Sequence, residues 1–253
     1  MAINNGDFIR LNFTGKIKES DDVFDTTYED VAKEANIYVE ERPYEAIPII
    51  VGANHLLPAI EKAVEGLESG DKKTIEVDSG DAFGPRIPEL IQLVPMRDFK
   101  KQGVTPMPGM TISMEGRTGK ILTVNGGRVK VDFNHELAAK DLVYDVEIID
   151  IIEDDEDKIK SLIELHYEFP SMNIDNTIIE IDGKTVNISL DDLTKFDQKS
   201  YMDITLNRFK ISKDIWDYMD MEKVNFTDSF EKRVFNREDD YGVELEEDLE
   251  EAL

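Results

Sequence analysis

The segment NHELAAKDLVYDVEII (134–149) decides the fold, because a polar loop in it leads directly into a long run of alternating side chains. Residues 141–151 alternate between apolar and polar positions, which is the pattern of a half-buried β-strand. FIRLNFTGKI (8–17) and KTIEVD (73–78) show the same alternation much earlier in the chain. We therefore expect residues 141–151 to return to the first unit of the chain and to supply its last long strand.

The sequence between the first two strands predicts a central helix and two lesser elements. HLLPAIEKAVEGLESGDKK (55–73) places its apolar residues on one helical face, with Pro58 in the first turn and glycines near the end. Thr27 is the expected N-cap of a short helix over residues 27–37. Pro48 restricts YEAIPIIVG (44–52) to an edge strand, because proline has no backbone N–H to donate to a neighbouring strand.

Residues 86–133 differ in character from the rest of the chain. They hold eight Lys or Arg residues against four acidic residues, whereas the whole chain of 253 residues has a formal net charge of −27. Four of the nine methionines also lie here, among short alternating runs and Gly-rich turns, of which Asn125-Gly126 is a strong hairpin signal. We expect a small β unit with a surface function of its own.

The last third of the sequence predicts a second α+β unit beyond the acidic run at 153–158. Its expected elements are a helix at 158–167, a hairpin at 177–190, strands at 200–211 and 223–235, and a helix at 212–220 capped by Ser212. The tail GVELEEDLEEAL (242–253) carries six acidic residues and no basic one. We expect this tail to be a solvated helix or a disordered end.

Composition excludes several classes of function. The net charge of −27 argues against non-specific nucleic-acid binding, and it also keeps a protein in solution. The absence of cysteine excludes disulfides, thiolate metal sites and cysteine nucleophiles. No apolar run approaches the roughly 18 residues of a membrane span, and MAINNGDFIRLNF lacks the features of a signal peptide. We therefore expect a cytoplasmic location without a membrane partner.

Three segments resemble the FKBP family of macrolide-binding prolyl isomerases. They are VFDTT (23–27), DAFGPR (81–86) and VYDVEII (143–149). GANHLLPAIEKAVEGLESGDKK (52–73) is similar to the family's central helix segment, and residues 134–149 resemble the N-H-x-L-A-G-K motif of its SlyD-like branch. The chain looks closest to the long archaeal type, which carries an insert-in-flap chaperone domain and a C-terminal domain.

The resemblance implies a fold class and a division into domains. The class is α+β, with an FKBP-like antiparallel sheet around a central helix, an inserted small β domain and a separate C-terminal α+β domain. Residues 1–87 and 132–153 would form the isomerase domain, residues 88–131 the insert, and residues 154–253 the C-terminal domain with its acidic tail.

The resemblance also implies the site. Its catalytic residues are Asp25, Leu57, Phe83 and Tyr144, and its substrate-binding residues are Phe13, Phe24, Ile47, Leu56, Ile60 and the insert methionines Met96, Met107, Met110 and Met114. The backbone N–H of Leu57 would hold the carbonyl that follows proline, and Asp25 would place polarity beside the rotating carbonyl. The apolar members are equally typical of a core, and Asp25 is equally typical of a carboxylate tied to backbone or to Tyr144.

Three positions depart from the family pattern. Ile60 stands where many relatives have Trp, Phe83 where the family usually has Tyr, and Ala139 where the motif has Gly. The Phe83 change removes one hydrogen bond of order 1 kcal/mol and weakens the expectation of tight macrolide binding.

Rotation about an X–Pro bond needs no cofactor, metal or proton transfer, only an apolar pocket that favours the less polar, twisted amide over the planar one. His55, His135 and His166 are far apart in the sequence, so we expect neither a metal site nor a cofactor.

The sequence therefore predicts a prolyl isomerase that also acts as a folding chaperone, whose partners are unfolded or nascent polypeptides with X–Pro bonds. The insert methionines suit a surface that repacks against varied apolar segments, and they are also typical of a small core. Three alternatives stay open. The pocket is a binding module without useful catalysis, the C-terminal domain docks on a basic assembly, or that domain makes the chain a homodimer.

Overall fold

The computed structural model describes residues 1–230 except 41, 115, 168 and 170. Its central sheet has the order β2-β1-β9-β4, with β3 also paired to β1, and every pairing in it is antiparallel. The strands are β1 (Phe8–Ile17), β2 (Val23–Thr26), β3 (Ile47–Ile50), β4 (Lys72–Val77) and β9 (Leu142–Ile152). The predicted α+β class is confirmed, and residues 141–151 do supply a long strand between β1 and β4.

Alternation along β1 divides its side chains between two hydrophobic cores. Ile9, Leu11 and Phe13 are buried in the first core together with Ile60 and Val64 of α2 (Pro58–Val64). Phe8 is buried in a second core, which the central sheet shares with the C-terminal part of the chain. The sheet is therefore covered by α2 on one face and by C-terminal helices near one end, and both contacts follow from the period of two.

The central helix is shorter than predicted, and the short helix near residue 30 starts elsewhere. α2 spans seven residues of the predicted 55–73, because residues 52–57 form a turn and Gly66 at φ 82° ends the helical region. α1 (Glu29–Glu34) has Tyr28 as its N-cap. Thr27 does not cap it, because its hydroxyl donates to Asn12 Oδ1 and accepts from the Phe13 N–H.

The inserted lobe is a four-stranded antiparallel sheet of order β5-β8-β7-β6. Its elements are a short 3₁₀ turn (Pro88–Leu90), β5 (Ile91–Pro95), α3 (Met96–Lys101), β6 (Thr111–Met114), β7 (Arg117–Asn125) and β8 (Arg128–Asp132). Gly126 and Gly127 join β7 to β8, so the predicted hairpin is confirmed. Phe99 and four aliphatic side chains form a small separate core.

The C-terminal lobe packs two helices against a sheet of order β10-β11-β12, in which β11 and β12 are parallel. Its elements are α4 (Asp155–His166), β10 (Ile178–Asp182), β11 (Thr185–Ser189), α5 (Tyr201–Tyr218), β12 (Lys223–Phe226) and 3₁₀ turns at Ile174–Asn176 and Asp192–Phe196. The helix predicted at 158–167 and the hairpin at 177–190 are confirmed. The acidic tail lies outside the described residues.

The prediction of a strand at 200–211 followed by a helix capped by Ser212 was wrong. Residues 201–218 form one helix, whose N-cap Ser200 accepts from the Asp203 N–H. Ser212 lies inside that helix and donates to the Arg208 carbonyl. Ile211 and Ile215 are buried at a spacing of four residues, which is the spacing of one helix face. The strand prediction assumed that every second side chain is buried. The strand predicted at 223–235 is limited to β12, and residues 231–235 lie outside the described residues.

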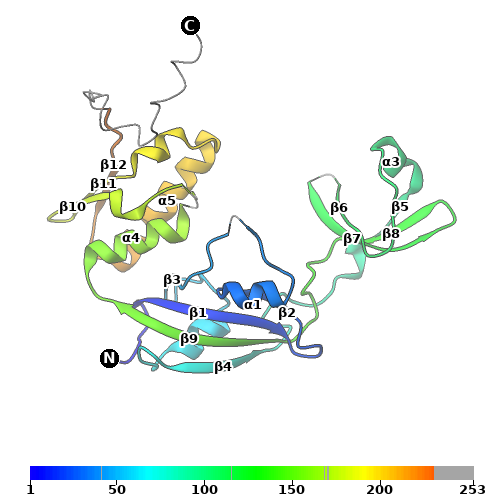
Figure 1. Ribbon diagram of the computed structural model, residues 1–253, viewed down its shortest axis with the longest axis horizontal. Helices are drawn as coiled ribbons and strands as arrows, with labels where there is room; N and C mark the ends of the chain where they lie inside the picture. Colours follow the sequence, from blue (N-terminus) through cyan, green and yellow to red (C-terminus); the bar gives the residue numbers. More distant parts are fainter. Residues whose placement is uncertain (41, 115, 168, 170, 231–253) are drawn as a thin grey trace, which may run out of the picture.

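Figure 1 shows the inserted lobe and the C-terminal lobe at opposite ends of the central sheet, with both lobes on the same side of it in this view. The C-terminal lobe is joined to the sheet through the second core and through an ion pair of 2.5 Å between Arg10 on β1 and Glu164 on α4. No helix in the described part of the chain has the length and apolar character that crossing a membrane requires.

Candidate functional site

Three aromatic rings meet where β1, β2 and β9 run side by side. The Phe24 ring stands edge-on to Tyr144, with centroids 5.7 Å apart and planes at 85°, and Phe13 lies 6.0 Å from Tyr144. Phe13 and Tyr144 are buried, whereas Phe24 is half-buried. The cluster therefore forms an aromatic wall that is open to solvent on the side of Phe24.

Gly15 allows this wall to close. It pairs with Asp25 on one side and Tyr144 on the other, directly beside the rings. A Cβ atom at Gly15 would lie 2.6 Å from Phe24 Cζ and 3.1 Å from Tyr144 Cε1, well inside normal carbon–carbon contact. Glycine is thus required here by close approach of side chains and not by its backbone angles.

The turn of residues 52–57 supplies the aliphatic side of the same cluster. Glu61 is buried, and its carboxylate accepts from the backbone N–H groups of Gly52, Asn54 and Leu56 at 2.8–3.0 Å. Leu57 is the N-cap of α2, and its backbone N–H donates a hydrogen bond to no other residue in the described part of the chain. This N–H is accordingly able to donate to a substrate carbonyl.

The Asp25 carboxylate lies at the rim of the wall. Its Oδ1 accepts from the Thr26 N–H at 2.8 Å and forms an ion pair of 2.7 Å with Arg42. Burial, and then the Asp25 charge, raise the pKa of the Tyr144 hydroxyl to about 12. Tyr144 is therefore neutral at physiological pH, where it offers a hydroxyl donor beside an anchored carboxylate.

Phe83 stands outside the aromatic wall. Its ring is 36% exposed and is stacked on His135, with centroids 4.1 Å apart and planes 3° from parallel. The next residue, Gly84, accepts from the Ala139 N–H at 2.8 Å, so the two family-like segments 81–86 and 134–149 lie against each other. Ala139 has φ 62°, which explains physically why glycine is usual at this position.

The structure therefore brings together seven of the nine predicted residues of the central site in one apolar cluster. Phe13, Ile60 and Tyr144 are buried in it, and Phe24, Ile47, Leu56 and Leu57 pack against it at the surface. Asp25 lies at the rim of the wall, and Phe83 is stacked on His135 outside the cluster.

The four predicted methionines lie apart from this cluster, in the inserted lobe. Met96 and Met114 pack on the Phe99 core, whereas Met107 is 62% exposed and Met110 is 36% exposed. Leu93 on β5 is likewise 61% exposed and pairs across the sheet with Lys130. The lobe thus presents exposed apolar side chains next to basic ones, and only half of its methionines serve its own core.

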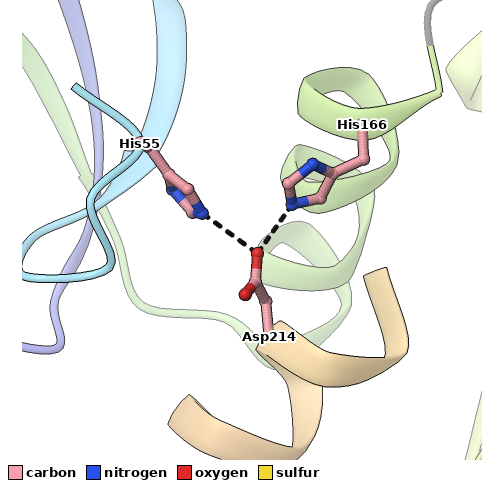
Figure 2. A group of neighbouring side chains, drawn as sticks. All are labelled: His55, His166 and Asp214. Atoms are coloured by element: carbon pink, nitrogen blue, oxygen red, sulfur yellow. Dashed lines mark hydrogen bonds and ion pairs between the residues drawn. The ribbon is translucent and has the colours of Figure 1, made fainter. Parts of the chain in front are cut away.

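One cluster of side chains was not predicted from the sequence. His55, His166 and Asp214 converge at the boundary between the central and C-terminal lobes (Figure 2). Their separations of 48 and 159 residues give no signal along the chain. Histidine and aspartate are common metal ligands, and the ligand atoms of these three side chains lie within 4.8 Å of one another. In the described part of the chain, this is the group of side chains that could hold a metal ion.

Comparison with known proteins gives matches to the inserted lobe, to the C-terminal lobe and to more than half of the chain. A family model described as "FKBP26, IF domain" matches residues 92–137, and one described as "FKBP26_C-terminal" matches residues 155–231. The "Short-type peptidyl-prolyl cis-trans isomerase" of Methanocaldococcus jannaschii is 38% identical over 149 residues, which cover 59% of this chain and 94% of that protein.

Two bacterial proteins named "FKBP-type peptidyl-prolyl cis-trans isomerase SlyD" are also similar. That of Escherichia coli strain K12 is 34% identical over 135 residues, covering 51% of this chain and 68% of the relative. That of Vibrio cholerae is 33% identical over 132 residues, covering 50% of this chain and 65% of the relative.

Proposed function

The chain belongs to the family of FKBP-type peptidyl-prolyl cis-trans isomerases, and on that premise we propose that it is also a folding chaperone. In this proposal the inserted lobe holds unfolded polypeptide while X–Pro bonds isomerise at the aromatic wall of the central lobe. The observation that carries the chaperone function is the exposure of Met107, Met110 and Leu93 on a lobe that has its own closed core.

The chemistry proposed for the central site needs only binding. The barrier to rotation is roughly 18–20 kcal/mol, because rotation breaks the amide resonance. The twisted amide is less polar than the planar one, so an apolar surface of Phe13, Phe24 and Tyr144 favours it. The Leu57 N–H, which has no acceptor among the described residues, holds the substrate carbonyl beyond the proline.

The substrates proposed for the inserted lobe follow from its surface. Thioether side chains adapt their shape to varied apolar segments, and the lobe's exposed lysines and arginines favour segments that also carry acidic residues. Loose binding there raises the local concentration of X–Pro bonds at the central site, which lies on the same chain.

Exposed residues on the full chain provide the test. Leu93→Ser with Met107→Ser should leave isomerisation of a tetrapeptide within twofold of wild type, but slow proline-limited refolding of a denatured protein about tenfold. Ile149→Ser with Ile178→Ser is the matched control, since it removes apolar side chains of 40% and 62% exposure from the other lobes. The proposed separation of binding and isomerisation between the two lobes would be contradicted if Leu93→Ser with Met107→Ser lost as much tetrapeptide isomerisation as refolding activity. It would also be contradicted if both double variants slowed refolding equally.

We also propose that α5 makes the chain a homodimer. Met202, Leu206, Phe209 and Trp216 are all exposed and lie along one face at intervals of four, three and seven residues. This spacing is that of a helix pair, in which a second copy of α5 covers the same stripe. Light scattering should give twice the 28.9 kDa of one chain, and Leu206→Glu should give 28.9 kDa. A wild-type monomer at micromolar concentration excludes the dimer.

A further inference from the structure

Two histidines from different lobes share one carboxylate oxygen (Figure 2). His55 belongs to the turn between β3 and α2, His166 is the last residue of α4, and Asp214 lies on α5. Asp214 Oδ2 is 3.0 Å from His55 Nε2 and 2.6 Å from His166 Nε2. All three side chains are between 9% and 13% exposed, so this contact is shielded from water.

The direction of the His55 hydrogen bonds follows from its other nitrogen. The backbone N–H of Ile50 donates to His55 Nδ1 at 3.1 Å, so Nδ1 carries no proton. The neutral ring then has its proton on Nε2 and donates it to Asp214. Both ring nitrogens are engaged, and the imidazole links the end of β3 to α5.

The same bond argues against a metal ion at this cluster. A metal on His55 Nε2 needs the lone pair of that nitrogen, which moves the proton to Nδ1, where it would face the Ile50 N–H. Burial tends to raise the pKa of Asp214, but hydrogen bonds from His166 and His55 outweigh burial and hold that pKa well below its usual range. The cluster is therefore a carboxylate held by two N–H donors.

α5 contacts the same turn at a second point. One helical turn beyond Asp214, the Tyr218 hydroxyl donates to the Gly52 carbonyl at 3.4 Å. On the other side, this turn is held by the carboxylate of Glu61, which accepts from its N–H groups. Residues 52–57 are thus clamped between α2 of the central lobe and α5 of the C-terminal lobe.

The clamped turn ends in the aliphatic part of the candidate site. His55 is followed directly by Leu56 and Leu57, and both pack against the cluster that contains the aromatic wall. A displacement of His55 therefore moves the side chains that face the substrate and the N–H of Leu57.

We propose that Asp214 is a positioning residue for prolyl isomerisation, acting through His55 from the C-terminal lobe. The inference rests on the proposed role of Leu56 and Leu57 in binding the prolyl substrate. In this arrangement α5 fixes the turn of the isomerase site, and turnover in the central lobe depends on how the C-terminal lobe is seated.

Kinetics of the full chain on a tetrapeptide test this. Asp214→Leu should lower kcat/KM about tenfold, which corresponds to about 1.4 kcal/mol. Asp214→Asn keeps an oxygen acceptor for both histidines and should retain at least a third of wild-type kcat/KM. Asp217→Leu is the matched control, because Asp217 lies about one helical turn after Asp214 on the exposed side of α5, where it pairs with Lys213. This variant should stay within twofold of wild-type kcat/KM.

The other members of the cluster separate positioning from simple stability. His55→Leu should lower kcat/KM as much as Asp214→Leu, and the double variant should be no worse than either, because both changes remove one link. His166→Leu removes a hydrogen bond within the C-terminal lobe and an edge-on ring contact with His55, whose centroid lies 5.4 Å away, but it leaves the bond from His55 to Asp214 in place. It should stay within twofold of wild type. If Asp214→Leu does not fold, the contrast between His55→Leu and His166→Leu still decides the question.

Three results overturn the proposal. The first is an equal loss of kcat/KM in His166→Leu and His55→Leu, and the second is a loss in the double variant that is the sum of the two single losses. The third is a long-range ¹H–¹⁵N spectrum in which His55 carries its proton on Nδ1. A titration of the wild-type chain with Zn²⁺ alone is expected to show no 1:1 complex. If a 1:1 complex forms and Asp214→Leu abolishes it, the three side chains are a metal site and the proposed positioning role is wrong. If Leu57→Ala is as active as wild type, the proposed pocket fails instead, whatever Asp214→Leu does.

Discussion

The substitution Gly15→Ala tests the aromatic wall most directly, because it adds one methyl group at a known place. The new Cβ would lie 2.6 Å from Phe24 Cζ, 3.0 Å from Phe24 Cε2 and 3.1 Å from Tyr144 Cε1. Carbon atoms in contact prefer about 3.5–4.0 Å. The tip of the Phe24 ring must therefore retreat by about 1 Å, while the buried Tyr144 has little room to yield.

The structure also sets the size of the effect. Overpacking costs about 1–3 kcal/mol in protein cores. Phe24 is half-buried and its ring can swing towards solvent, so we expect the lower end, about 1 kcal/mol, in the free energy of unfolding. The edge-on contact between Phe24 and Tyr144 is lost with that movement. We expect kcat/KM to fall about tenfold, since the displaced ring is the open side of the wall.

Two other glycines serve as controls in the same assays, which are tetrapeptide isomerisation and urea unfolding. A Cβ at Gly80 meets no heavy atom within 4 Å, so Gly80→Ala should leave both quantities near wild type. A Cβ at Gly119 would lie 2.7 Å from Phe133 Cδ1 and 2.8 Å from Val131 Cγ1 in the inserted lobe. Gly119→Ala should destabilise that lobe by about 1–3 kcal/mol and leave tetrapeptide turnover within twofold.

Turnover of Gly15→Ala within twofold of wild type would refute the role given to Phe24. So would an equal loss of tetrapeptide turnover in Gly119→Ala, because the two sites would then not be separable.

Two further predictions concern single groups. Burial and the Asp25 charge raise the pKa of the Tyr144 hydroxyl to about 12 in the folded protein, whereas in the unfolded chain this hydroxyl ionises near pH 10. The stability that Tyr144 contributes is therefore complete below pH 10 and falls between pH 10 and 12. In Asp25→Asn that pKa should be lower, as measured by ultraviolet titration against Tyr144→Phe; an unchanged value contradicts the coupling. Ala139→Gly should raise the free energy of unfolding by about 0.5–1 kcal/mol, because Ala139 is exposed at φ 62° and loses strain without losing packing. Lower stability in urea unfolding would show that this strain is absent.

Local patterns predicted the strands of the central sheet well, because their side chains alternate between a buried face and an exposed one. They failed for α5, where Ser212 and the polar residues before it favoured two short elements over one helix of 18 residues. The buried face of α5 is defined by the core that it shares with Phe8, Ile50 and Ile152 of the central lobe. That core is formed by residues far apart in the chain, so no local window contained the deciding information.

The family-like motifs named nine residues for the candidate site, and the fold brings seven of them into one apolar cluster. Three properties of this cluster and of the inserted lobe came only from the fold. The Leu57 N–H is without an acceptor among the described residues because Glu61 holds the preceding turn. Phe83 is committed to a stack with His135. The methionines of the insert divide evenly between core and surface, which composition alone did not separate.

The sequence by itself determined the strand pattern, the separate character of residues 86–133 and seven residues that meet in one apolar cluster. Each of these features depends on residues that are close together in the sequence, through alternation of apolar and polar side chains, local charge or a short motif. Only the tertiary structure decided that His55 and His166 meet at Asp214, since side chains 159 and 48 residues from that carboxylate come within 3.0 Å only through packing. Packing brings them together because α4, α5 and the start of β1 bury one shared apolar core, which places the Asp214 carboxylate against the turn of residues 52–57.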